Sequence, residues 1–138
     1  MSTHGFLCFT NIEKEEMLNS RDFEEIGELL ADEVKIYKHF DGYDIGTFLS
    51  DFLKDEALRR DVPENLTAWA LYELMASQDL SYYKDQKSGY YLMTYDKFEG
   101  WDMDYLFVVV KGEEVLLYRY GEFKGIYTLN NLEELKDV

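Results

Sequence analysis

Two apolar segments near the end of the chain, separated by a short turn, constrain the fold more than any other feature. Residues Tyr105–Val110 and Val115–Tyr120 are rich in β-branched and aromatic side chains, which favour strands. Lys111-Gly112, which lies between them, is typical of a tight turn. The pattern therefore predicts an antiparallel β-hairpin.

Similar patterns predict four more strands and three helices. The further strands are expected at Gly5–Phe9, Val34–Lys38, Tyr90–Tyr95 and Ile126–Leu129. Apolar spacing predicts helices over Asp22–Glu33, over Ile45–Leu53 with Asp44 as its cap, and from Pro63 to about Ser77. Residues 131–138 are expected to form a short capped helix or a frayed tail. We expect one α+β domain over residues 1–138, with a mainly antiparallel sheet and about three helices packed on one face.

The charge balance excludes several classes of partner. The chain has 29 acidic and 14 basic side chains, and its net charge is −15. This field opposes approach to phosphate backbones and to anionic lipid, so we expect neither direct nucleic-acid binding nor membrane binding. It favours a basic protein partner, including one whose own ligand is nucleic acid. The alternative is that the acidity only keeps the protein soluble.

The acidic side chains are concentrated in one segment. Nine acids lie between Glu13 and Glu33, against only Lys14 and Arg21. A helix with one apolar stripe and a negative outer face is expected there. The predicted partner-binding residues are Glu24, Glu25, Glu28, Asp32 and Glu33.

Cysteine usage and the lack of an apolar leader indicate a compartment. Cys8 is the single cysteine, so no intrachain disulfide can form and a reducing compartment fits. The chain has no secretory leader pattern and no apolar run of membrane-spanning length. We therefore expect a cytoplasmic protein.

His39 and Asp41 are the candidate catalytic residues by residue type. They lie in a strand-to-helix turn, where a histidine near a carboxylate could act as a general base. Backbone N–H groups of the following helix could also face a ligand there. The alternative is a structural turn, in which Asp41 and Gly42 shape the backbone and His39 bonds a backbone carbonyl.

Motifs for metals and cofactors are missing. No zinc-type or calcium-loop spacing exists, and Gly42–Gly46 lacks the Lys-Ser/Thr that completes a phosphate loop. The acids Asp96, Glu99, Asp102 and Asp104 around Trp101 could hold a hard cation, but a solvated acidic loop is favoured. We therefore predict no cofactor and no metal site.

Three segments carry a resemblance. Ile36-Tyr-Lys-His-Phe-Asp-Gly-Tyr43 resembles a Tyr-x-His-Trp/Phe-Asp-Gly/Ser-Tyr motif, which marks a family of small uncharacterised proteins of bacteriophages, bacteria and fungi. The start, Met1-Ser-Thr-His-Gly5, is similar to the family's usual start, with His4 where Arg is usual. Trp101–Val108 resembles the family's second block. Asp44 stands where the family usually has Pro. The resemblance implies a fold and a phage-like origin, but no reaction.

Three functional hypotheses follow from these observations. The favoured one is a non-enzymatic acidic binding protein, a phage-type counter-defence or nucleic-acid-mimic inhibitor that blocks a basic partner. The second is a small enzyme that uses His39 and Asp41. The third is a bacterial immunity protein that neutralises a basic toxin.

Overall fold

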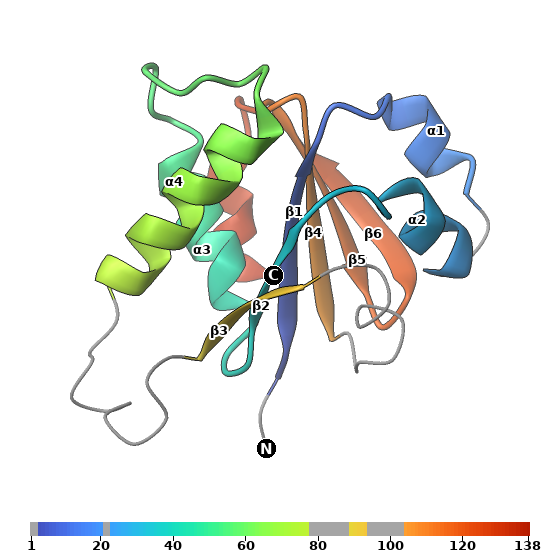
Figure 1. The fold of residues 1–138 in the computed structure, drawn as a ribbon, viewed down its shortest axis with the longest axis horizontal. Coiled ribbons are helices and arrows are strands. Elements are labelled where there is room, and N and C mark those ends of the chain that lie inside the picture. The colour runs from blue at the N-terminus through green and yellow to red at the C-terminus, as the bar shows by residue number, and fades with distance from the viewer. Residues whose placement is uncertain (1–2, 21–22, 78–88, 94–103) are drawn as a thin grey trace.

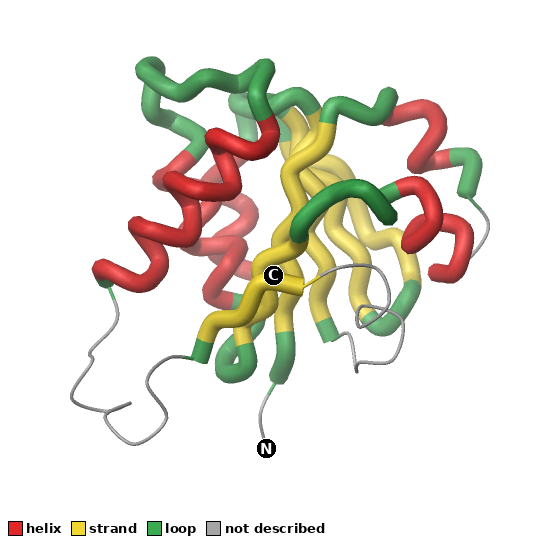
Figure 2. The backbone as a smooth tube through the Cα atoms, in the orientation of Figure 1, coloured by secondary structure: helices red, strands yellow, loops and turns green. Residues whose placement is uncertain are grey.

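A six-stranded mixed sheet forms the centre of the computed structural model, which describes residues 3–20, 23–77, 89–93 and 104–138 (Figures 1 and 2). Its strands, in spatial order β3-β2-β1-β4-β5-β6, are β1 Gly5–Thr10, β2 Lys35–Lys38, β3 Tyr90–Met93, β4 Tyr105–Val110, β5 Glu114–Arg119 and β6 Glu122–Tyr127. Five of them coincide with segments that the sequence predicts as strands, whereas β6 begins four residues before the expected strand Ile126–Leu129 and shares only Ile126 and Tyr127 with it.

The pairing of β1 with β4 makes the sheet mixed. These two strands are parallel, with Gly5 opposite Tyr105 and Thr10 opposite Val110. The other neighbouring pairs are antiparallel. A parallel pair needs a long crossover, and here the chain passes through the first four helices, β2 and β3 before it returns.

The predicted hairpin is confirmed as β4 and β5. Lys111 and Gly112 both have positive φ, 55° and 68°, and the Glu113 N–H donates to the Val110 carbonyl at 3.1 Å. Arg60 holds the turn from outside, because its guanidinium donates to the carbonyls of Gly112 and Leu53. A Cβ at Gly112 would lie 2.7 Å from Arg60 Cβ, so glycine is required there for two reasons.

Three helices cover one face of the sheet, which confirms the α+β class, and the predicted acidic helix is not among them. They are α3 Asp44–Phe52, α4 Pro63–Ala76 and the 3₁₀ helix η1 Leu132–Asp137. Side chains such as Leu49, Leu66 and Leu135 form a core with alternate residues of the sheet. In the described part of the chain, no helix is both long and apolar enough to cross a bilayer.

Two short helices, α1 Lys14–Leu18 and α2 Phe23–Leu29, cover the opposite face (Figure 1). Met17, Ile26 and Leu30 form a second core there with Phe6 and Cys8 of β1. Because both faces are covered, every residue of β1 and β4 is buried.

Two local expectations need correction. The acidic segment is not one helix that runs to Glu33. Instead α1 and α2 are separate, and α2 ends at Leu29, so Asp32 and Glu33 lie in the turn before β2. Asp44 is not a cap either, because it is the first residue of α3, Tyr43 occupies the N-cap position and no side-chain cap bond forms.

Candidate functional site

The five predicted partner-binding carboxylates are accessible but do not form one group. Glu24 and Glu28 are exposed on α2, whereas Glu25 is half-buried. Beyond the helix, Asp32 is exposed and Glu33 is half-buried. We call Glu24, Glu25 and Glu28, together with Glu16 of α1, the acidic surface.

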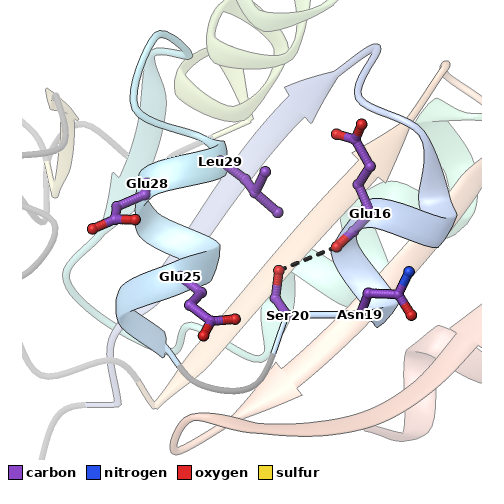
Figure 3. Close-up of a pocket in the computed structure, with 6 residues that line it drawn as sticks. All are labelled: Glu16, Asn19, Ser20, Glu25, Glu28 and Leu29. Atoms are coloured by element: carbon purple, nitrogen blue, oxygen red, sulfur yellow. Dashed lines mark hydrogen bonds between the residues drawn. The ribbon is translucent and has the colours of Figure 1, made fainter.

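A hollow of about 440 Å³ lies between α1 and α2 (Figure 3). Leu29 points into the space between the two helices, and Glu28 points away from α1. The Ser20 hydroxyl donates to the Glu16 carbonyl at 3.1 Å and so fixes the end of α1. The lining is Glu16, Asn19, Ser20, Glu25, Glu28 and Leu29. Three of these described lining residues are carboxylates, and none is Lys or Arg. The hollow is therefore a negatively charged recess.

Asp32 and Glu33 line a second hollow, which we call the α4 cleft. Its volume is also about 440 Å³, and its lining comprises Asp32, Glu33, Val34, Glu64, Thr67, Ala68, Leu71, Tyr72 and Leu92. Burial raises the pKa of Glu33, and the carboxylates of Glu64 and Asp32 raise it further. A hydrogen bond from the Thr10 hydroxyl, 3.4 Å from Glu33 Oε1, opposes that shift. This second hollow combines clustered acids with apolar walls.

The structure brings both histidines of the chain together around one tyrosine. Tyr37 is buried on β2, and its hydroxyl lies 2.9 Å from His4 Nδ1 and 2.8 Å from His39 Nδ1. The two imidazole rings stack with centroids 4.7 Å apart. Strand register explains the meeting, because Gly5 pairs with Lys38 and the next residues outward are His4 and His39. We call these three residues the histidine cluster.

Hydrogen-bond chemistry gives the cluster a direction. His4 Nδ1 lies 2.8 Å from the His39 carbonyl oxygen, which can only accept, so His4 Nδ1 carries a proton. That N–H also faces the Tyr37 oxygen, and the Tyr37 hydroxyl can in turn donate to His39 Nδ1. When Tyr37 donates in this way, His39 is the neutral tautomer that is protonated on Nε2.

The electrostatics of His39 agree with this assignment. Burial lowers the pKa of His39, and the neighbouring His4 lowers it further. The protonated imidazolium would present a second donor to Tyr37 and would lie against the stacked ring of His4. The cluster therefore favours the neutral form of His39 at neutral pH.

Asp41 does not join His39 in the way that the enzyme hypothesis requires. The charges of Asp41 and Asp44 instead act on Tyr43 and raise the pKa of its hydroxyl. Asp41 has a φ of 51°, and its carbonyl accepts the Asp44 N–H at 2.8 Å. The backbone geometry of Asp41 thus forms the turn itself.

Gly42 is required by a close approach rather than by positive φ. Its N–H donates to the Thr3 carbonyl at 2.9 Å. A Cβ on Gly42 would lie 2.5 Å from the Gly5 nitrogen and 2.6 Å from the His4 oxygen. The turn and the N-terminal segment are therefore locked together.

The remaining reactive groups offer little chemistry. Burial raises the pKa of Cys8 to about 12, so its thiol stays protonated. Within the described ranges, no group of three or more His, Cys, Asp or Glu side chains is placed to hold a metal ion. Of the acidic loop considered for a hard cation, Asp96, Glu99 and Asp102 lie outside the described residues. Asp104 accepts the His4 backbone N–H at 2.7 Å.

Sequence reasoning missed His4 and Tyr37 as members of a site. Tyr37 and His39 are two residues apart at the end of a strand, so their side chains are expected on the same face, and this signal was available. The position of His4 depends on the register of β1 against β2, which no local pattern reveals.

Comparison with known proteins finds no matching family model, no matching curated protein and no matching solved structure. The resemblance to the phage, bacterial and fungal family therefore remains a prediction. Its main motif, Ile36–Tyr43, covers most of β2, includes Tyr37 and His39 of the histidine cluster, and ends at the N-cap of α3.

Proposed function

We propose that this protein is a non-enzymatic binding protein whose acidic surface occupies a basic surface of another protein. The favoured biological role is that of an inhibitor, which blocks a nucleic-acid-binding enzyme of the cell where it acts. A phage-type counter-defence protein fits this role, and an immunity protein against a basic toxin works by the same physics.

The observation that carries the proposal is the α1–α2 hollow. Three glutamates from two helices line a recess whose described lining contains no Lys or Arg. The chain's net charge of −15 adds a long-range field of the same sign. Such a field accelerates the approach of a basic protein to this chain. It also lowers the affinity of this chain for nucleic acid and anionic membranes.

The second candidate function, a small enzyme, draws on the histidine cluster. Two imidazoles that share a hydroxyl could relay a proton. The contacts of Tyr37 with both histidines, and of His4 with the His39 carbonyl, favour a structural role instead. A His39→Asn variant that stays folded and loses all biological effect would reverse this preference.

The test compares two double variants that change the net charge by the same amount. Glu24→Lys with Glu28→Lys reverses the acidic surface. Glu134→Lys with Asp137→Lys is the matched control, because both residues are exposed on η1, on the other face of the sheet. Each protein is titrated with one defined basic probe, a lysine-rich peptide, at low and at high salt. Amide chemical shifts and the dissociation constant are measured.

We expect the α2 variant to weaken binding about tenfold at low salt and the η1 variant to weaken it much less. The shifts of the wild-type protein should concentrate on α1 and α2, and high salt should weaken its binding because exposed charges are screened. Equal losses in the two variants would mean that only net charge matters. That result would contradict a specific acidic surface.

A further inference from the structure

The α4 cleft differs from the α1–α2 hollow in the nature of its walls. Three large apolar side chains around it are exposed, Val34 at 44%, Tyr72 at 64% and Leu92 at 55% of their surface. They come from three separate elements, the turn before β2, helix α4 and strand β3. Leu71, half-buried on α4, completes the apolar lining. Exposed apolar groups that gather around one recess are typical of an interaction site.

Acids border the same cleft. Glu64 lies in the first turn of α4, and Asp32 and Glu33 lie in the turn that follows α2. The carboxylates are close enough that Glu64 and Asp32 both disfavour the charged form of Glu33. Lys35 acts in the opposite direction, but its ammonium is buried and donates to the Leu30 carbonyl. Among the described residues that line the cleft, no Lys or Arg is present.

We propose that the α4 cleft is an anchor site for a segment of a basic protein in which aliphatic side chains flank a lysine or arginine. The aliphatic groups pack against Leu92, Val34 and Leu71, and the cationic head group lies against the carboxylates of Glu33 and Glu64. This inference rests on the proposed function, because the segment belongs to the same basic partner. It adds an apolar anchor to a surface that is otherwise described by charge alone.

Charge complementarity selects this occupant over others. A second copy of the chain would bring another −15 charges to an already negative border. Anionic lipid is repelled for the same reason. A neutral apolar molecule would fill the lining but would leave three carboxylates repelling one another. A segment that carries both a cation and an apolar group satisfies both halves of the cleft.

The first experiment uses three short peptides and the full chain labelled for NMR. The probe is acetyl-Leu-Lys-Leu-amide, and the controls replace its lysine by glutamine or its leucines by serine. We expect saturable amide shifts for the probe at millimolar concentrations, centred on residues 32–34, 64–72 and 92. The glutamine control should bind about threefold more weakly, and the serine control about tenfold more weakly.

Two variants of the protein separate the apolar and acidic contributions. Leu92→Ser removes an exposed apolar contact, and Glu64→Gln removes one charge while keeping the shape of the side chain. Each variant is expected to bind the probe about threefold to tenfold more weakly, while its circular dichroism spectrum stays unchanged. Glu134→Gln, which is exposed on η1 and lines neither hollow, is the matched control and should leave the dissociation constant unchanged. A bound cation should also lower the pKa of Glu33, which can be followed by titrating its side-chain carboxyl signal.

The outcomes are distinct for the cleft and for the acidic surface. Equal binding of the lysine and glutamine peptides, shifts outside the cleft, or no saturable binding would overturn the cleft proposal. Those results would leave the test of Glu24 and Glu28 untouched. Conversely, cleft binding together with equal losses in the two charge-reversal variants would overturn the acidic surface and retain the cleft.

Discussion

The acidic surface and the histidine cluster lie on the same face of the sheet but differ in burial. The first consists largely of exposed side chains, and the second is built around a buried, hydrogen-bonded side chain. Glu24 and Glu28 project from a seven-residue helix into solvent. Tyr37, in contrast, is buried, and its ring lies 5.0 Å from the Phe6 ring between centroids. Around it, two histidines and the Gly42 turn make contacts that join the N-terminal segment to the end of β2.

This difference separates stability from binding. Exposed charges on a short helix contribute little to folding, and they are free to meet a partner. A buried hydroxyl between two imidazoles is costly to disturb, because a buried polar group that loses a hydrogen bond has little water to replace it. We therefore expect substitutions in the cluster to change the free energy of unfolding, and substitutions on the acidic surface to change association.

The largest expected effect is that of Gly42→Ala. Its new Cβ would lie 2.5 Å from the backbone nitrogen of Gly5, so the turn or β1 must move. We expect a loss of about 3 kcal/mol in the free energy of unfolding, measured by urea denaturation. Gly125→Ala is the control, since the atom nearest to its Cβ would be in the Tyr127 ring, at the ordinary contact distance of 3.7 Å, and the change should cost less than about 1 kcal/mol. Similar losses in both variants would show that the turn is not locked to the N-terminal segment.

An intermediate effect is expected from pH. Because the pKa of His39 is lowered below its ordinary value of 6.5, the unfolded chain takes up a proton first as the pH falls. The stability contributed by neutral His39 is fully present above pH 6.5. It is lost as the pH falls from 6.5 through the lower pKa that His39 has in the folded protein. Urea denaturation about one unit above and about one unit below that value should show this loss in the wild-type protein.

His39→Asn is the variant that isolates this contribution. Its amide oxygen can still accept the Tyr37 hydroxyl proton, but it does not titrate. The carboxyls of Glu33 and Asp44, whose pKa values are raised chiefly by burial, titrate in both proteins and cancel in the comparison. If the free energy of unfolding falls by the same amount at acid pH in the variant and in the wild type, His39 is not held neutral by the cluster.

The two regions also differ in how far sequence could predict them. The acidic segment was visible as composition, and the hairpin and the helix that begins at Pro63 were visible as local turn and cap signals. The histidine cluster was not, because His4 reaches His39 only through the register of β1 against β2. The parallel pairing of β1 with β4 was missed for the same reason.

A local sequence pattern does indicate that helices cover both faces of the sheet. Tyr105–Val110 is apolar at every position, whereas a strand with one wet face alternates apolar and polar side chains. Every one of these residues is buried, half of them against α1 and α2. The separation of Asp32 and Glu33 from α2 had no such signal, because it depends on where the chain turns into β2.

The smallest expected effect is on the stability of the acidic surface itself. Replacing Glu24 and Glu28 by Lys should change the free energy of unfolding by less than about 0.5 kcal/mol, because neither side chain is buried. Two contributions oppose each other in this variant. It loses an acid in the first turn of α2, where the helix dipole favours negative charge, and it gains relief from the repulsion of a chain with a net charge of −15.

Salt separates these two contributions. Added salt screens the net repulsion and should stabilise the wild-type protein more than the variant, which carries less negative charge. Urea denaturation at low and high salt measures this difference. An equal salt response, together with a large loss of stability in the variant, would mean that the carboxylates of α2 hold the fold, and the division between a binding surface and a stabilising cluster would then fail.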